Sequence, residues 1–336
     1  MAQERNQVRI ISAEHTLENY TFENGDYLEQ VRIAYKIFGD LQPKADNLLL
    51  VLPGTSNISE STLDHIGPGR AYDTDKYCVI STDAIGGGGS SKPSDGLFGR
   101  FPRYSIRDLV NLQVRFVREG LKIRDEPFAV LAGASMGAFQ TLEWLINYPD
   151  TVSNAILLVP AWHANNAFKL ATDRMNDFIH LDPNWSAGNY QNKPSAGLRA
   201  AGGHYFAWTV TDEYLEATNL AELRKQAQAA GDWFESWDAW DILLRYACSS
   251  SHDVTEPFDG DLQAALARIN ARCLILPCRQ DRLLGIKGAQ ALAKGIKNAV
   301  YDEIDSITGH LAWRPRPGSD HTTFVTRTIR NFLSLP

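Results

Sequence analysis

The first half of the chain alternates between short apolar runs and longer segments with helical spacing. Residues 28–38 alternate apolar and polar side chains, as a half-buried antiparallel strand does, and Asn24-Gly25-Asp26 before them favours a hairpin turn. Continuous apolar runs, typical of buried parallel strands, occupy residues 48–52, 77–80, 128–132 and 155–159. Helical spacing predicts helices over residues 105–120 and 138–148. The alternation predicts a mostly parallel sheet with helices on both faces.

The pattern changes after residue 160. Residues 161–260 show no strand pattern, and they hold six of the eight tryptophans. Strand patterns return at residues 273–277 and 300–304, and helical patterns return at 287–296 and 322–333. We therefore expect one α/β core made of residues 1–160 and 261–336, with residues 161–260 inserted as a helical cap. A chain of 336 residues suits one large domain with an insertion.

Composition and charge narrow the class of protein. The chain is 44% hydrophobic and 22% charged, as globular proteins are, and its net charge of −7 comes without a Lys/Arg run, so we expect no nucleic-acid partner. Residues 1–10 lack the apolar core of a signal peptide, and the apolar runs are too short to span a bilayer. The four cysteines form no C-x-x-C pair, which favours reduced thiols and no metal site. We expect a cytoplasmic protein with no membrane partner.

A candidate nucleophile follows the strand at residues 128–132. Gly133-Ala134-Ser135-Met136-Gly137 is a G-x-S-x-G motif with a helix after it, which is the arrangement of a nucleophile elbow. The two glycines leave room where a side chain would meet the neighbouring strand or helix, and the helix N-terminus favours developing negative charge. An ordinary Gly-rich strand-to-helix turn is the alternative. The context predicts that Ser135 forms an acyl-enzyme.

The same fold places an acid and then a base after the nucleophile in the chain. Asp281 follows the strand at residues 273–277, where it would orient the base; a helix N-cap or a partner for Arg279 or Arg282 are its alternatives. His310 lies on the loop after the last strand and is the candidate general base. His321 is the rival, but Asp320-His321-Thr322 is typical of a helix start, so we favour His310.

Two further loops bear on the predicted site. The oxyanion hole requires two backbone N–H groups, one from Met136 after the nucleophile and one from the loop after the first buried strand, where Thr55 is favoured because Pro53 has no N–H. The run of glycines at residues 86–89 fails both nucleotide-binding patterns, and we interpret it as a flexible loop near the pocket mouth. His163 and His204 in the cap are further candidates for the pocket wall.

These residues resemble a known family. Residues 67–77 (GPGRAYDTDKY), 105–108 (SIRD), the elbow with its helix, and the cap segments at 182–185 (DPNW), 188–190 (GNY) and 197–198 (GL) are similar to those of the homoserine O-acetyltransferase branch of the α/β-hydrolases. The resemblance implies the α/β-hydrolase fold with a helical cap, and a serine that takes an acetyl group from acetyl-CoA and passes it to a hydroxyl acceptor. By position it implies a triad of Ser135, Asp281 and His310, oxyanion donors Thr55 and Met136, and a homodimer built through the cap.

Two departures from that family concern the acceptor. The family's homoserine enzymes read H-A-L-T-G-D where this chain has residues 52–57 (LPGTSN). They also carry an arginine for the amino-acid carboxylate at a position that here is Gly202, and Arg199 nearby is out of register. A bidentate arginine is hard to replace at a carboxylate site. We therefore expect an acceptor other than homoserine.

The leading hypothesis is a serine hydrolase of a small acyl ester, thioester or lactone that needs no cofactor. The second is an O-acyltransferase that uses acetyl-CoA as co-substrate and an acceptor other than homoserine. Both hypotheses use the same three residues and differ in whether water or an alcohol resolves the acyl-enzyme. A non-catalytic binding protein with the same fold is the third. The cap tryptophans fit either core packing or a dimer interface.

Overall fold

The computed structural model describes residues 9–124, 127–316 and 318–335. Within these residues eight strands form one sheet in the order β1-β2-β4-β3-β5-β6-β7-β8. The strands are β1 (Ile10–Thr21), β2 (Tyr27–Phe38), β3 (Leu48–Leu52), β4 (Cys78–Thr82), β5 (Phe128–Ala134), β6 (Val152–Leu158), β7 (Arg272–Leu276) and β8 (Ala299–Tyr301). The α-helices are α1 (Ile106–Arg115), α2 (Met136–Asn147), α3 (Asn166–His180), α4 (Ser195–Thr209), α5 (Asp212–Ala217), α6 (Leu220–Ser236), α7 (Ala239–Ser250), α8 (Leu262–Leu266), α9 (Ile286–Gly295) and α10 (Asp320–Ser334).

The sheet is antiparallel at one edge and parallel elsewhere. β1 and β2 form a hairpin across the predicted turn, and β2 pairs antiparallel with β4. From β4 through β3, β5, β6 and β7 to β8 every neighbouring pair is parallel. The parallel strands therefore present their carboxyl ends at one edge of the sheet, where open α/β sheets bind ligands. The mostly parallel sheet that the sequence predicted is confirmed.

Alternate side chains of the central strands point into two separate cores. Leu48, Leu50 and Leu52 of β3 pack into the core that α1, α2, α8 and α9 cover. Leu49 and Val51 pack into the opposite core, which α10 covers. Because successive strand side chains face opposite sides of a sheet, a run of apolar residues requires helices on both faces. That expectation from the sequence is confirmed.

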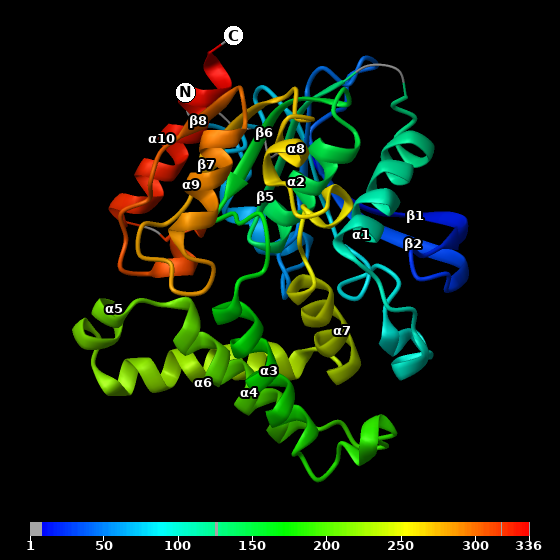
Figure 1. Cartoon of the computed structure of the whole chain (residues 1–336), viewed down its shortest axis with the longest axis vertical. Helices are drawn as coiled ribbons and strands as arrows, with labels where there is room; N and C mark the ends of the chain where they lie inside the picture. Colours follow the sequence, from blue (N-terminus) through cyan, green and yellow to red (C-terminus); the bar gives the residue numbers. More distant parts are fainter. Residues whose placement is uncertain (1–8, 125–126, 317, 336) are drawn as a thin grey trace, which may run out of the picture.

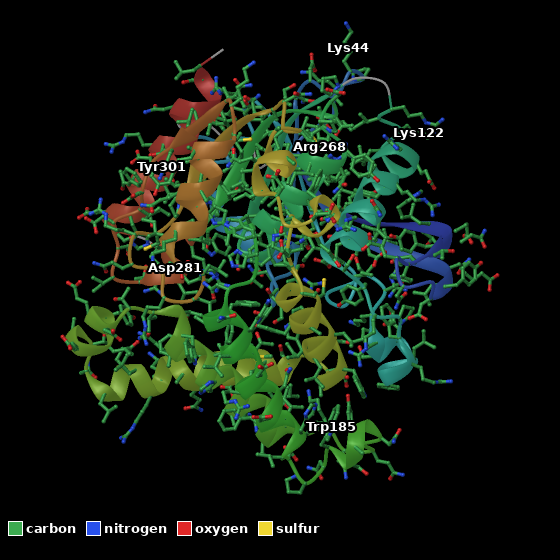
Figure 2. All side chains as sticks on the ribbon, viewed as in Figure 1. Lys44, Lys122, Trp185, Arg268, Asp281 and Tyr301 are labelled. Carbon is green, nitrogen blue, oxygen red and sulfur yellow. The ribbon has the colours of Figure 1, made fainter. Side chains whose placement is uncertain are left out.

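The helices α3 to α7 lie between β6 and β7 in the chain and together on one side of the core (Figure 1). Trp185 and Trp237 are buried, and Trp185 packs against the ring of Trp240. Figure 2 places Trp185 at the far end of this helical layer, whereas Asp281 lies where the layer meets the core. Trp185 and Trp237 are thus packed within the chain, which agrees with the core-packing explanation for these two residues.

Two local predictions need correction. The last strand, predicted over residues 300–304, is only Ala299–Tyr301. Its partner β7 is followed by Pro277, which has no N–H to continue the ladder, and Ile304 forms an isolated bridge with Cys278 beyond it. The glycine run at residues 86–89 was predicted to be a flexible loop near the pocket mouth. It is not among the described residues that line the cavity beside Ser135. It is packed tightly, since a Cβ at Gly87 would come within 2.2 Å of the Trp237 ring. The glycines serve close packing there, which the composition of the run could not distinguish from flexibility.

Candidate active site

Ser135 lies at a strained turn between β5 and α2. Its backbone has φ 56° and ψ −120°, a conformation that L residues rarely adopt and that clusters at functional sites. A Cβ at Gly133 would lie 2.1 Å from the Gly137 carbonyl oxygen, and a Cβ at Gly137 would lie 2.3 Å from the carbonyl oxygen of Leu52. Only glycine fits at either position, so the motif's two glycines allow the turn to form.

Ser135, His310 and Asp281 lie in one hydrogen-bonded line. His310 Nε2 is 2.9 Å from Ser135 Oγ, and His310 Nδ1 is 2.7 Å from Asp281 Oδ2. Ser135 follows β5, Asp281 follows β7, and His310 lies in a short 3-10 turn after β8. These strands end at the same edge of the parallel sheet, which explains how residues far apart in the chain meet. His310 and Asp281 are 5% and 7% exposed, so water competes little for their hydrogen bond.

Asp281 uses both of its carboxylate oxygens. Oδ1 accepts from the backbone N–H groups of Leu283 and Leu284, at 2.8 and 3.1 Å, while Oδ2 is left for His310. Arg279 and Arg282 both pair with other carboxylates. The backbone bonds fix the carboxylate in the orientation that faces the imidazole. The structure thus brings Asp281 to His310 rather than to the arginines that the sequence offered as alternatives.

His321 lies away from this line. Its ring nitrogens are 3.4 Å from the hydroxyls of Ser306 and Ser319 and contact neither Ser135 nor Asp281. It belongs to α10, which begins at Asp320. Ser319 occupies the N-cap position of this helix, so His321 lies in the first turn, at the helix start that the sequence predicted. The geometry favours His310 over His321 as the base.

The loop that carries Thr55 lies against the elbow. β3 and β5 are hydrogen-bonded neighbours, and a Cβ at Gly54 would come within 3.3 Å of the Ala134 carbonyl oxygen. Met136 is the first residue of α2, so its N–H has no acceptor inside the helix. The Thr55 hydroxyl bonds to Ser249 Oγ at 3.0 Å, which ties this loop to α7. Both predicted oxyanion donors therefore lie in turns adjacent to Ser135.

The sequence analysis did not identify Arg245, whose side chain hydrogen-bonds to the loop that carries Thr55. This side chain of α7 is fully buried and donates five hydrogen bonds of 2.8–3.3 Å to backbone carbonyl oxygens. The acceptors are Gly54, Thr55, Asn57, Ala84 and Ile85. A charged residue within the apolar run of residues 242–248 was the one available signal, because a buried arginine requires partners.

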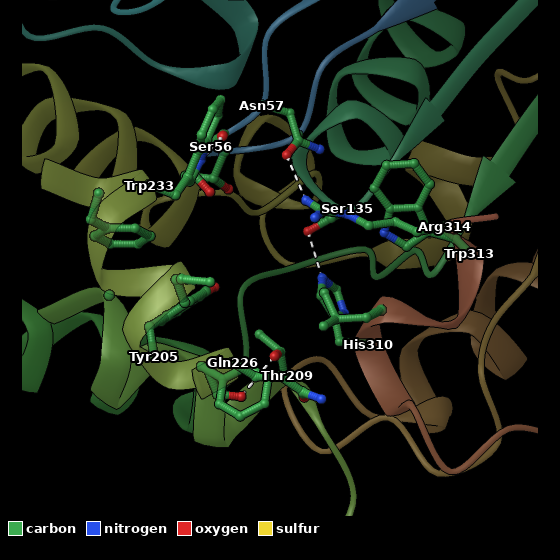
Figure 3. A pocket seen from close by; sticks show the side chains of 18 of the residues that line it. Ser56, Asn57, Ser135, Tyr205, Thr209, Gln226, Trp233, His310, Trp313 and Arg314 are labelled. Carbon is green, nitrogen blue, oxygen red and sulfur yellow. Dashed lines mark hydrogen bonds between the residues drawn. The ribbon is translucent and has the colours of Figure 1, made fainter. Parts of the chain in front are cut away.

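A cavity of about 550 Å³ opens beside Ser135 and His310 (Figure 3). Helices α4 and α6 supply an aromatic wall, formed by Tyr205, Phe206, Trp233 and Phe234. The core side is polar and includes Ser56, Asn57, Arg314 and Arg316. The described lining residues contain no aspartate or glutamate. This volume and this mixture of apolar wall and few polar groups are typical of small-molecule sites.

Other cap residues considered from the sequence lie elsewhere. Neither His163 nor His204 is among the described residues that line the cavity. Arg199 pairs with Asp232 on the surface and is 55% exposed, so it does not replace the missing family arginine. Gly202 does line the cavity, at the position where the family's arginine was expected.

Among residues 9–124, 127–316 and 318–335, no group of three or more His, Cys, Asp or Glu side chains is arranged to hold a metal ion. Over the same ranges no helix is both long and apolar enough to cross a membrane.

Comparisons with known proteins agree with the fold. Residues 47–313 match the family described as alpha/beta hydrolase fold. The chain is 31% identical over 307 residues to the ethyl acetate hydrolase of Pseudomonas veronii, with 86% of each chain covered. It is 29% identical over 359 residues to the homoserine O-acetyltransferase of Leptospira biflexa, with 95% of this chain and 92% of the relative covered. The solved structure of the acetyl esterase MekB superposes with a TM-score of 0.90 at 26% identity, covering 97% of each chain.

The resemblance stated from the sequence is therefore confirmed, and it extends to esterases as well as acetyltransferases. Because the family match spans most of the chain and includes the elbow, the chain belongs to the α/β-hydrolase fold family, in the branch that includes homoserine O-acetyltransferases and esterases.

Proposed function

We propose that the chain is a serine hydrolase of small acyl esters, thioesters or lactones, with Ser135, His310 and Asp281 as its triad. The observation that carries the proposal is the continuous line of hydrogen bonds from Asp281 Oδ2 through His310 to Ser135 Oγ. Relatives named ethyl acetate hydrolase and acetyl esterase support the same class.

In the proposed reaction, Ser135 Oγ attacks the acyl carbonyl carbon while its proton passes to His310 Nε2. Asp281 stabilises the imidazolium that results. The oxyanion accepts hydrogen bonds from the N–H groups of Thr55 and Met136. When this intermediate collapses, His310 returns the proton to the leaving alcohol or thiol and an acyl-Ser135 remains.

Water completes the reaction in the proposed hydrolase. His310 Nε2 removes a proton from the water as its oxygen attacks the acyl carbon, and the ester bond to Ser135 Oγ then breaks. The proton returns to Ser135 and the free acid leaves. These steps require no cofactor and no metal.

The second candidate is an O-acyltransferase that takes acetyl from acetyl-CoA and gives it to an acceptor other than homoserine. The relationship to a homoserine O-acetyltransferase supports it. Homoserine itself is disfavoured by the packing of α4 against α6. A Cβ at Gly202 would lie 2.4 Å from the Ala230 carbonyl oxygen, so no larger side chain fits there unless the helices separate.

An assay with two arms tests this choice. We expect the purified protein to hydrolyse 4-nitrophenyl acetate, and we expect L-homoserine not to accelerate thiol release from acetyl-CoA. Ester hydrolysis by the wild type and its loss in Ser135→Ala would support the hydrolase. Homoserine-dependent thiol release would overturn the hydrolase proposal in favour of the transferase.

We also propose that residues 161–260 act as a cap over the cavity and carry a homodimer interface. On α3, Leu170 and Phe178 lie on one face and are 50% and 38% exposed, and Leu181 just after the helix is 79% exposed. Exposed apolar side chains that gather in this way favour a protein contact. Sedimentation should give twice the 37.4 kDa chain mass, and a Leu181→Asp variant should shift the measured mass toward that of the monomer.

A cytoplasmic location is proposed as well, supported by four buried cysteines without disulfides.

A further inference from the structure

Arg314 connects the two halves of the candidate site. It follows the 3-10 turn Gly309–Trp313, which carries His310. Its Nη2 donates a hydrogen bond of 2.9 Å to Asn57 Oδ1, and Asn57 lies two residues after Thr55 (Figure 3). The guanidinium is therefore held between the loop of the proposed base and the loop of the proposed oxyanion donor.

The positive charge of Arg314 is not balanced by the surrounding residues. Neither Arg314 nor Arg316 has an acidic side chain within 4.0 Å in the described part of the chain. Both line the cavity, whose described lining residues include no carboxylate. The surrounding protein atoms, and then the charge of Arg316, lower the pKa of Arg314, although its side chain keeps access to the cavity. Two guanidinium groups that face one cavity without a carboxylate between them repel each other, so this arrangement favours an anionic ligand.

The guanidinium is also accessible and has donors to offer. Arg314 remains exposed to the cavity although protein surrounds it. A guanidinium carries five N–H donors in a planar fork, and the neutral amide oxygen of Asn57 occupies one of them. A fork of this shape matches the two oxygens of a carboxylate.

We propose that Arg314, supported by Arg316, forms a carboxylate subsite beside Ser135. The preferred substrates are then small esters that carry a carboxylate a few bonds from the scissile carbonyl. A carboxylate fits better than the phosphates of coenzyme A, because the pantetheine arm separates those phosphates from the thioester by many bonds. The inference rests on the proposed function for the identity of the reacting carbonyl, and it adds the substrate class.

Matched pairs of esters test the subsite. Acetoxyacetate and acetoxyacetamide share the same acetyl ester but differ in charge, and monomethyl succinate and methyl succinamate place the same difference on the acyl side. We expect kcat/KM for at least one carboxylate ester to exceed that for its amide partner tenfold or more. In Arg314→Gln that ratio should fall about ten- to a hundredfold, the usual effect of losing a charge-assisted hydrogen bond. Arg314→Lys should retain part of the ratio.

The control is Arg199→Gln, which removes a surface arginine outside the cavity and should leave the ratio unchanged. Ratios near one for both pairs in the wild type would overturn the proposal. A ratio unchanged by Arg314→Gln would also overturn it, because Arg314 would then only hold Asn57 in place.

Binding to the Ser135→Ala variant separates this proposal from the proposed function, since it needs no turnover. Calorimetry should detect tighter binding of the carboxylate ester than of its amide partner, and Arg314→Gln in the same background should remove the difference. If the wild type hydrolyses no ester but this preference is found, the hydrolase proposal fails and the subsite stands. Equal affinity for both partners overturns the subsite even in an active esterase.

Discussion

The Nε atom of Arg245 donates a hydrogen bond of 3.0 Å to the carbonyl oxygen of Thr55. A cap helix thereby holds the backbone of the residue whose N–H we propose for the oxyanion hole. Arg245 Nη2 also donates a hydrogen bond of 3.1 Å to the Gly54 carbonyl oxygen, and because that oxygen shares a planar peptide unit with the Thr55 N–H, the bond restricts the direction of this N–H. The position of Arg245 predicts that the cap supports catalysis without contacting substrate.

Replacement of Arg245 by methionine should affect both stability and turnover. It leaves five buried carbonyl oxygens without their donor, so we expect a loss of at least about 2–5 kcal/mol in the free energy of unfolding. Below the melting temperature, kcat should fall at least about tenfold with little change in KM, because only oxyanion stabilisation is impaired. Arg245→Lys should recover part of kcat. A folded Arg245→Met variant with full kcat would contradict a positioning role.

The two candidate bases can be ranked by alanine substitution. His310→Ala should lose about a thousandfold or more of the turnover, because triad members act as a unit. His321→Ala should retain turnover within a small factor, since its ring contacts the hydroxyls of Ser306 and Ser319 and neither Ser135 nor Asp281. Esterase kinetics on both variants provide the measurement, and the reverse ranking would transfer the role of base to His321.

Gly202 and Gly203 offer a matched test of the helix contact that excludes the family arginine. In Gly202→Ala the new Cβ would lie 2.4 Å from the Ala230 carbonyl oxygen, so we expect a loss of about 1–3 kcal/mol in the free energy of unfolding. In Gly203→Ala the nearest atom is 3.3 Å away, and better helix propensity, worth up to about 1 kcal/mol, should largely offset the strain. Chemical denaturation of the two variants checks the difference. Equal effects would show that α4 and α6 can separate easily.

The pH dependence of stability should contain a contribution from His65. Burial lowers its pKa to about 4, from an ordinary value of 6.5. Between these values the unfolded chain binds a proton that the folded protein does not, so the free energy of unfolding falls as the pH drops through this window, by roughly 1.4 kcal/mol per unit. His65→Phe, which retains a ring to stack on Trp313, should flatten this slope. Urea titrations between pH 6.5 and 4 give the free energy of unfolding of both proteins. If its slope against pH is the same in the wild type and in His65→Phe, His65 makes no such contribution.

Sequence patterns predicted the parts of the molecule that local chemistry determines. The run at residues 48–52 coincides with β3, and the G-x-S-x-G motif contains the strained Ser135 because only glycine fits on either side. The order of the triad along the chain then pointed to Asp281 and His310. The geometry now places their side chains within hydrogen-bonding distance.

Residues that act through contacts distant in the chain could not be predicted in this way. Arg245 bonds to carbonyls about 160 to 190 positions away, and no local pattern specifies such partners. Arg314 bonds to Asn57 across 257 positions, so its place in the cavity emerged only from the fold. The glycine run at 86–89 suggested flexibility, but the bulky Trp237 ring from the cap packs against it.

Covalent labelling of Ser135 tests the central proposal most directly. A fluorophosphonate reacts with a serine that a neighbouring base activates, and peptide mass spectrometry identifies the modified residue. We predict a single adduct on Ser135, abolished in Ser135→Ala and strongly slowed in His310→Ala, with no adduct on Ser249 or Ser56 nearby. Labelling of another serine, or an unlabelled Ser135 in folded protein, would contradict the proposal that this residue forms the acyl-enzyme.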